Sequence, residues 1–290
     1  MTPRPTPNSV LPQITEDAIA LMKGAANPRL REVMSIMIRH LHDAVREAEL
    51  SETEWAEAIG FLTRTGQISN ESRQEFILLS DVLGVSMLVD AINHDDSGPV
   101  TSSTVFGPFY AGLQPELPAG SSILKRPERG DALIVEGRVL DRDGAPLSGA
   151  LIEVWQTAPN GFYDVQDPEQ PPGHLRASFR TGPDGAYSFR TVLPVDYPIP
   201  DDGPVGQLLG SMGRHPNRPA HIHFMISAAQ HHRLVTHLFI AGSSYLDSDA
   251  VFGVKPELVV APELGPQGLA LHYDFHLGGS NVLVPQRTVL

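Results

Sequence analysis

The feature that most constrains the fold is a change in the spacing of apolar residues near residue 100. Between about residues 15 and 95, apolar side chains recur every three or four positions, which is the spacing of one helix face. After residue 100, short alternating runs follow one another between turns rich in glycine and proline. We therefore predict an α+β fold, with a helical domain over residues 1–100 and an antiparallel β-sandwich over residues 101–290.

Local signals predict where the helices of the first domain begin. Asn27 followed by Pro28 is typical of a helix start, because asparagine caps the first turn and proline needs no hydrogen bond there. Ser51 with Glu54 three residues later has the pattern of a capping box. A third, strongly apolar helix is predicted over residues 71–92.

The helix that follows Pro28 carries an apolar stripe. Met34, Met37 and Leu41 recur at helical spacing, and a small sandwich cannot cover all of the apolar helical surface. We therefore expect the helical domain to pack against a second copy of the chain.

The strands of the second domain are predicted from the alternating runs ALIVEGRVL, GALIEVWQT, GAYSFRTVL, PAHIHFMIS, LVTHLFIAG and ALHYDFHL. The tetrapeptides DRDG and GPDG are turn signals between runs. The stretch GRVLDRDGAPLSGALIEVW resembles a hairpin that is common in non-enzymatic, transthyretin-like sandwiches. The architecture alone therefore allows a non-catalytic binding module as well as an enzyme.

The composition excludes several classes of protein and of site. A net charge of −13, from 21 basic and 34 acidic residues, argues against binding to nucleic acid or to an anionic membrane. The chain has no cysteine, which excludes disulfides and thiolate metal sites and favours a reducing cytosol. The first residues lack the apolar core of a signal peptide, and no later run approaches a membrane span. We predict a cytoplasmic protein.

Two histidines lie two residues apart in the predicted strand that contains RPAHIHF. Residues i and i+2 of a strand point to the same face, so His221 and His223 can bind one metal ion. The interleaved Ile222 and Phe224 form an apolar face. The same alternation also suits histidines on the wet side of a sheet, and the period alone does not separate the two cases.

A second set of metal-ligand residues lies in HYDFH. His272, Asp274 and His276 share one face of a predicted strand and have the ligand types of many non-haem Fe(II) oxygenases. An Fe(II) or zinc enzyme built on these residues is therefore an alternative. A wet strand face gives the same pattern.

Loop residues upstream of RPAHIHF carry a family resemblance. Tyr163 in NGFYD and Tyr197 in DYPIP lie in loops rich in proline and glycine. Together with GRHPNRPAHIHF and STVFGPFY, these motifs resemble the intradiol ring-cleaving dioxygenases, and the likeness covers most of the chain. The resemblance implies one Fe(III) per chain, held by Tyr163, Tyr197, His221 and His223. Phenolate is a hard, anionic ligand that favours ferric iron, and imidazole is a suitable neutral donor.

The resemblance also implies what the protein binds and which other residues act. An ortho-diphenol and O2 are the expected substrates, Tyr197 accepts one of the phenolic protons, and Arg218 stabilises negative charge on the ring. His237 matches a position that orients a ligand or the oxygen species, although a core histidine is an alternative. The expected assembly is a homodimer through the N-terminal helices, where an apolar channel can hold lipid.

The loops after Asp196 and the segment YLDSDAVFGV resemble those of hydroxyquinol-cleaving members of the family more than catechol-cleaving ones. The expected product is 3-hydroxy-cis,cis-muconate, and catechol or a substituted catechol is the alternative substrate. Tyr110 departs from the histidine expected in this position. The residues that match the substrate pocket are Leu78, Asp81, Val105, Phe106, Gly107, Pro108, Phe109, Ile199, Pro200, Arg218 and Val251. The carboxylate of Asp81 either meets the extra hydroxyl or pairs locally near a helix end.

Overall fold

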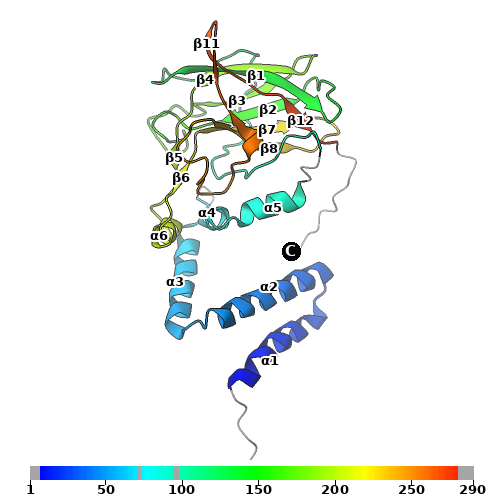
Figure 1. The fold of residues 1–290 in the computed structure, drawn as a ribbon, viewed down its shortest axis with the longest axis vertical. Coiled ribbons are helices and arrows are strands. Elements are labelled where there is room, and N and C mark those ends of the chain that lie inside the picture. Colours follow the sequence, from blue (N-terminus) through cyan, green and yellow to red (C-terminus); the bar gives the residue numbers. More distant parts are fainter. Residues whose placement is uncertain (1–6, 71–72, 95–97, 280–290) are drawn as a thin grey trace, which may run out of the picture. The chain divides into compact units, whose positions relative to one another are not determined.

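The computed structural model describes residues 7–70, 73–94 and 98–279, with side chains described from residue 13 onward. These residues form two compact units, residues 7–63 and residues 64–279. The predicted α+β class is confirmed, because helices dominate before residue 100 and strands after it (Figure 1). The domain boundary at residue 100 stays a prediction.

The first unit contains α1 (Pro7–Ala20), the 3₁₀ turn η1 (Leu21–Gly24), α2 (Pro28–Glu47) and most of α3 (Glu52–Ile68). Both predicted helix starts are confirmed. The Asn27 side chain accepts hydrogen bonds from the backbone N–H groups of Arg29 and Leu30, at 3.0 and 3.2 Å. The backbone N–H of Ser51 donates to the Glu54 carboxylate, and the N–H of Glu54 donates to the Ser51 hydroxyl. Each exchange satisfies N–H groups that have no partner within the helix.

The apolar stripe on α2 is exposed in the single chain. Met34, Met37 and Leu41 are 39%, 59% and 63% exposed. Within the described part of the chain, no helix combines the length and the apolar character needed to cross a membrane.

After the end of α3, the second unit contains two short helices where one long helix was predicted. From residue 73 onward, the segment predicted as one helix over residues 71–92 forms α4 (Glu75–Val82) and α5 (Val85–Asn93) instead, and residues 71–72 lie outside the described residues. The break lies at Gly84, which adopts a left-handed conformation with φ 75°. Glycine takes this conformation without steric cost and commonly ends helices, so the prediction of one continuous helix is wrong.

Two five-stranded sheets form the sandwich beside α4 and α5 (Figure 1). One sheet has the order β10-β11-β1-β12 with β4 also paired to β1, and the other has the order β3-β2-β7-β8-β9. The strands are β1 (Ala132–Asp141), β2 (Leu151–Trp155), β3 (Arg176–Arg180), β4 (Ala186–Val192), β7 (His221–Ser227), β8 (Leu234–Ile240), β9 (Val259–Val260), β10 (Glu263–Gly265), β11 (Gly268–His272) and β12 (Phe275–Leu277). β5 (Tyr197–Pro198) and β6 (Asn217–Arg218) pair as a small two-stranded ribbon, and α6 (Pro204–Ser211) lies between them in the sequence. A 3₁₀ turn, η2 (Pro256–Leu258), precedes β9.

The sheets are mixed, so the prediction of a purely antiparallel sandwich is wrong in this detail. β1 pairs in parallel with β11 and β12, and β8 pairs in parallel with β9. These strands come from the last part of the chain and reach their neighbours through long connections, which permit parallel pairing where a tight hairpin does not. The run ALHYDFHL divides into β11 and β12 because the Tyr273 carbonyl approaches Gly137 of β1. A Cβ added at Gly137 would lie 1.9 Å from that oxygen.

The main core lies between the two sheets, and β7 contributes one face to it. Ile222, Phe224 and Ile226 are fully buried there, as the apolar alternation predicts. The opposite face is also buried, with His221 and His223 each 1% exposed. Loops cover this second face, so its histidines are not on a wet surface.

Candidate metal centre

The four predicted metal ligands lie together at the second face of β7. The Tyr163 hydroxyl is 3.1 Å from the Tyr197 hydroxyl and 2.9 Å from Nε2 of His223. Nε2 of His221 is 3.2 Å from Nε2 of His223 and 3.4 Å from the Tyr197 hydroxyl. Two oxygen and two nitrogen atoms therefore meet at one point inside the protein, and each of the four side chains is at most 3% exposed.

The strand positions of the histidines follow from the sheet. β7 is hydrogen-bonded on both sides, to β2 and to β8, which fixes its backbone. His223 stands opposite Trp155 of β2, and the two rings stack with centroids 4.7 Å apart. The indole therefore limits rotation of the His223 ring.

The two tyrosines reach the histidines from loops that are held locally. Tyr197 lies in the ribbon of β5 and β6 and pairs with Arg218, three residues before His221. Tyr163 stacks on Phe109, with ring centroids 4.7 Å apart, and the guanidinium carbon of Arg176 lies 5.5 Å from the centroid of the Tyr163 ring. Backbone pairing with β6 therefore holds Tyr197 in its buried position, and packing against Phe109 and Arg176 holds Tyr163.

Hydrogen bonding fixes the tautomer of His221. Its Nδ1 lies 2.7 Å from the Pro219 carbonyl oxygen, which can only accept, so Nδ1 carries the proton. Nε2 therefore presents a lone pair to the cluster. Burial and the Arg218 guanidinium lower the pKa of His221 to about 3, and burial also holds the pKa of His223 well below its usual value. Both imidazoles are neutral at pH 7, which is the form that binds metals.

The tyrosine hydroxyls need a cation to ionise. Burial raises the pKa of Tyr163 well above its usual value, and Tyr197 adds to the rise. Burial also raises the pKa of Tyr197, although the Arg218 guanidinium opposes that rise. Phenolates form here only when a strong positive charge joins the cluster.

The donor set suits a metal ion. Ligand atoms that share one ion at about 2.0–2.1 Å lie about 2.8–3.4 Å apart, depending on whether the angle between them is a right angle or tetrahedral. The four separations between neighbouring donor atoms run from 2.9 to 3.4 Å. The histidines supply lone pairs, and the tyrosines supply acidic oxygens whose negative charge a hard trivalent ion would stabilise.

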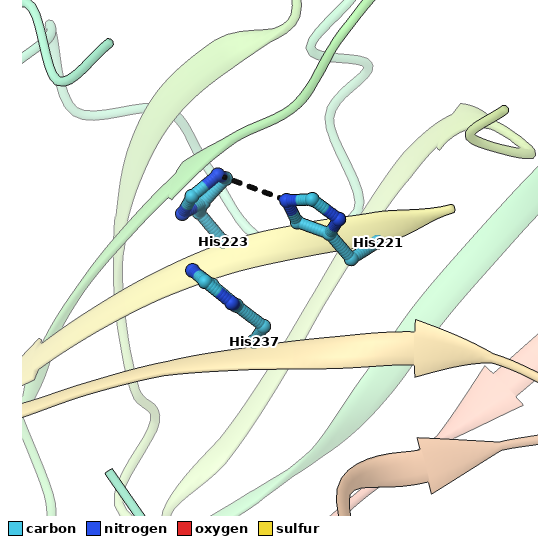
Figure 2. A group of neighbouring side chains, drawn as sticks. All are labelled: His221, His223 and His237. Carbon is cyan, nitrogen blue, oxygen red and sulfur yellow. Dashed lines mark hydrogen bonds between the residues drawn. The ribbon is translucent and has the colours of Figure 1, made fainter. Parts of the chain in front are cut away.

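A third histidine lies beside the first two. His237 stands on β8 directly opposite His223 of β7, and Figure 2 shows the three imidazoles close to one another beside these two strands. One ring nitrogen from each of the three lies within 4.8 Å of the others. Among the described residues, no other set of three or more histidine, aspartate or glutamate side chains lies close enough together to hold a metal ion. Nε2 of His237 is buried and has no hydrogen-bond partner in the structure. A three-histidine site is thus the geometric alternative to the four-ligand one.

Arg218 is held against this cluster by a carboxylate that the sequence did not single out. Its Nε and Nη2 donate to the two oxygens of Asp249, at 3.0 and 3.2 Å, and its Nη1 donates to Nε2 of His221 at 3.2 Å. Burial opposes the charge on Asp249, but Arg218 outweighs it and lowers the pKa of that carboxyl. Asp249 lies within YLDSDAVFGV, and nothing in that segment predicts that this aspartate is buried. Its partner, Arg218, becomes apparent only in the folded structure.

The predicted pocket residues differ in burial. Leu78, Asp81, Val105, Ile199 and Val251 are buried, Phe106 is 41% exposed, and Pro108 is also exposed. Gly107, Phe109 and Pro200 are partly buried.

Besides Arg218, two of the predicted pocket residues lie against the ligand cluster. Gly107 has φ 75°, and a Cβ added to it would lie 3.2 Å from Cε1 of His223. Glycine is therefore required both by its conformation and by its closeness to the ring. Phe109 makes the second contact, through its stack on Tyr163.

Tyr110, the departure from the family pattern, has a partner of its own. Its hydroxyl donates to the buried carboxylate of Glu153 at 2.6 Å, and its ring lies 5.2 Å from Trp155. Burial and the Glu153 charge raise the pKa of Tyr110 to about 12. The tyrosine thus links the loop before it to β2.

The second ligand set from the sequence does not form a metal site. The His272 side chain is 67% exposed and lies 3.3 Å from a carboxylate oxygen of Asp274. That same oxygen accepts a hydrogen bond from the backbone N–H of Arg138. His276, on the separate strand β12, has its Nδ1 3.3 Å from the Asp141 carbonyl oxygen. These residues behave as a polar strand face with local partners.

Known proteins resemble this chain along both of its parts. Residues 106–279 match the family described as Dioxygenase, and residues 27–99 match the family described as Catechol dioxygenase N terminus. The first match alone spans more than half of the chain.

Individual relatives carry more specific names. The chain is 54% identical to a hydroxyquinol 1,2-dioxygenase from a Rhizobium species, over 84% of this chain and 83% of that protein. It is 40% identical to a catechol 1,2-dioxygenase from Candida albicans, over 85% of this chain and 82% of that protein. The solved structure of a hydroxyquinol 1,2-dioxygenase from Pseudomonas putida matches with a TM-score of 0.89 and 47% identity, covering 94% of this chain and 99% of that chain.

Proposed function

Because this chain belongs to the family of intradiol ring-cleaving dioxygenases, we propose that it cleaves hydroxyquinol, 1,2,4-trihydroxybenzene, with O2 between the two adjacent hydroxylated carbons. Both oxygen atoms enter one product, 3-hydroxy-cis,cis-muconate, and no external reductant is consumed. The chain is an enzyme of this family, and the non-catalytic sandwich module that its hairpin resembles is set aside.

The cofactor that we propose is one Fe(III) per chain, held by Tyr163, Tyr197, His221 and His223. The observation that carries this assignment is the convergence of these two hydroxyls and two imidazole nitrogens within 3.4 Å of their neighbours. When bound, ferric iron withdraws electron density from a coordinated diphenolate and makes a ring carbon reactive toward O2.

Three polar residues have proposed roles around that centre. Tyr197 accepts a proton from the diol, since it lies on the short β5–β6 ribbon beside Arg218, whereas the ring of Tyr163 packs on both Phe109 and Arg176. Arg218 stabilises the negative charge on the substrate. With the His221 lone pair engaged by iron, the Nη1–H of Arg218 loses its present acceptor and becomes available to the ring.

His237 orients the reacting oxygen in this proposal. Its imidazole lies against both iron-binding histidines, and its Nδ1 lies 3.5 Å from Nη2 of Arg218. Burial holds the pKa of His237 well below its usual value, so the ring is neutral and offers one N–H and one lone pair.

Asp81 is the proposed partner of the third hydroxyl, which distinguishes hydroxyquinol from catechol. The side chain is only 3% exposed, and burial raises the pKa of its carboxyl. A hydrogen bond with Ser86 and the charge of Arg218 oppose that rise in pKa, and the third hydroxyl of the substrate would be a further hydrogen-bond partner for the carboxyl. The other pocket residues named above, Leu78, Val105, Ile199 and Val251 among them, supply the apolar walls.

We further propose a cytoplasmic homodimer that associates through the N-terminal helices, where the exposed apolar stripe on α2 can also contact lipid. The absence of cysteine suits a reducing compartment. The proposed substrates are a small aromatic diol and O2. The net charge of −13 argues against binding to nucleic acid.

Oxygen uptake with hydroxyquinol and with catechol tests the proposed substrate. We expect a higher kcat/KM for hydroxyquinol, and a ratio that falls about ten- to a hundredfold in Asp81→Asn, the worth of a charge-assisted hydrogen bond. A wild-type preference for catechol would return the protein to the alternative, for which the 40% identical catechol 1,2-dioxygenase is the supporting relative.

A further inference from the structure

Arg214 is placed by the way in which α6 ends. Gly213, with φ 69°, follows the helix, and its N–H donates to the Gly210 carbonyl at 3.0 Å. The N–H of Arg214 donates to the Leu209 carbonyl at 2.9 Å. This pair of bonds is a Schellman motif, which satisfies the last carbonyls of the helix and fixes the direction in which the chain leaves it.

The side chain of Arg214 joins two other segments through their backbones. Its Nη1 donates to the Val82 carbonyl at 2.5 Å, and its Nη2 donates to the Ala250 carbonyl at 2.9 Å. Val82 is the last residue of α4, so its carbonyl has no partner within the helix. The guanidinium also lies 4.7 Å from the centre of the Phe252 ring, which covers it.

Both carbonyls adjoin residues of the proposed pocket. Asp81 immediately precedes Val82, and Val251 immediately follows Ala250. Asp249, which precedes Ala250, holds the Arg218 guanidinium and also accepts from the backbone N–H groups of its own turn. The two sides of the pocket come from segments more than 160 residues apart, at positions 81 and 249–253, and Arg214 bridges them.

We propose that Arg214 is a positioning residue that determines substrate specificity, by fixing Asp81 and Val251 relative to each other across the bound ring. The side chain of Arg214 bonds to the backbones of Val82 and Ala250 and not to the proposed ligands, so it acts through the two segments that it joins. A guanidinium suits this task because its rigid fork satisfies two carbonyls at once, whereas a lysine ammonium is a single point on a flexible stem. The inference rests on the proposed pocket but does not depend on which diol is preferred.

The test measures the ratio of kcat/KM for hydroxyquinol to that for catechol in Arg214→Met, Arg214→Lys and wild type. We expect the ratio to change about tenfold in the methionine variant, because shifts of about 1 Å in a positioning contact commonly cost that much or more. Iron content and the visible spectrum should stay those of wild type in both variants. Arg180→Met is the matched control, since Arg180 also donates to a backbone carbonyl, that of Gly149, but joins no pocket segment.

A double variant separates positioning from general destabilisation. If Arg214 acts through Asp81, the ratio in Arg214→Met with Asp81→Asn should equal the ratio in Asp81→Asn alone, because the two changes remove the same discrimination. A merely structural role would lower the melting temperature and the rates with both substrates equally, and would leave the ratio unchanged.

The outcomes distinguish this inference from the proposed function. A ratio in Arg214→Met and Arg214→Lys equal to that of wild type would overturn the role of Arg214, whichever diol wild type prefers. If Arg214→Met does not fold, the lysine variant carries the same test. A wild-type preference for catechol would overturn only the proposed substrate, and a changed ratio in the variants would still support the role of Arg214.

Discussion

At the scale of single residues, burial sets the chemistry of the centre. His221, His223 and His237 are each at most 1% exposed, and burial lowers the pKa of all three. Neutral imidazoles are therefore ready to bind a metal or to accept a hydrogen bond without first losing a proton. The same burial leaves the tyrosine hydroxyls protonated until a cation arrives.

The neutral histidines make the iron-free protein sensitive to acid. They remain neutral in the folded chain but protonate in the unfolded chain below a pKa of about 6.5, so the unfolded state binds more protons and stability falls as pH falls. Each such histidine costs about 1.4 kcal/mol per pH unit in that window. Urea unfolding of iron-free protein at pH 7.5 and 5.5 should show this loss, and His237→Gln should reduce it. Equal stability at both pH values would mean that these histidines are already charged in the fold.

His237→Ala distinguishes the four-ligand centre from a three-histidine one, and His223→Ala tests a ligand that both sets share. His223→Ala should remove iron and visible absorption together, since it deletes a proposed ligand. His237→Ala should keep about one iron per chain and the absorption of phenolate bound to Fe(III), because the proposed ligands all remain. Metal analysis measures the iron content of each variant, and a visible spectrum measures its phenolate-to-Fe(III) absorption. Loss of iron in His237→Ala, together with a wild-type spectrum that lacks phenolate absorption, would favour the three-histidine set.

Residue identity at the centre was predictable because the ligands occupy short motifs. The paired histidines and the loop tyrosines could be named from RPAHIHF, NGFYD and DYPIP. Asp249, Trp155 and Arg176 could not, because their roles depend on partners distant in sequence, such as Arg218 for Asp249. Nothing local marks an aspartate as the partner of an arginine 31 positions away.

At the scale of elements, glycines decide where the backbone can approach the site. The left-handed conformation of Gly107 brings the loop of residues 103–110 against His223, and Gly84 divides α4 from α5. The sequence predicted the run of helical residues around Gly84 but not the break, since glycine occurs within helices as well as at their ends. The division of ALHYDFHL into β11 and β12 was likewise unpredictable, because it depends on the approach of Tyr273 to Gly137.

Replacing Gly107 by alanine should perturb the metal centre. The added Cβ would lie 3.2 Å from Cε1 of His223, and the conformation costs about 1–2 kcal/mol for a residue with a side chain. We expect lower iron content or a shifted visible band. Gly112→Ala is the matched control, because Gly112 has φ 81° but nothing within 4 Å of the added Cβ. Identical spectra in Gly107→Ala and wild type would show that this contact does not hold the histidine.

At the scale of the whole molecule, the change of period near residue 100 predicted the order of helices and strands, but not the mixed pairing of the sheets. Alternation identifies strands without naming their neighbours, and the parallel partners of β1 lie far along the chain. The apolar stripe of Met34, Met37 and Leu41 is exposed in the single chain, and we propose that a second copy of the chain covers it.

A charge within the stripe should weaken the proposed dimer. Leu41→Lys places an ammonium where the partner chain would bury apolar surface, so sedimentation at micromolar concentration should shift from dimer toward monomer. His40→Lys adds the same charge to the neighbouring position of α2, outside the stripe, and should leave the dimer intact. A wild-type protein that sediments as a monomer would contradict the proposed assembly.

The most direct measurement is the identity of the product formed from hydroxyquinol under isotopically labelled O2. Mass spectrometry should find 3-hydroxy-cis,cis-muconate with two labelled oxygen atoms, one in each new carboxyl group, because cleavage between the hydroxylated carbons places one oxygen atom on each. A product cleaved outside the two hydroxyls, or one that carries no label, would contradict the proposed reaction.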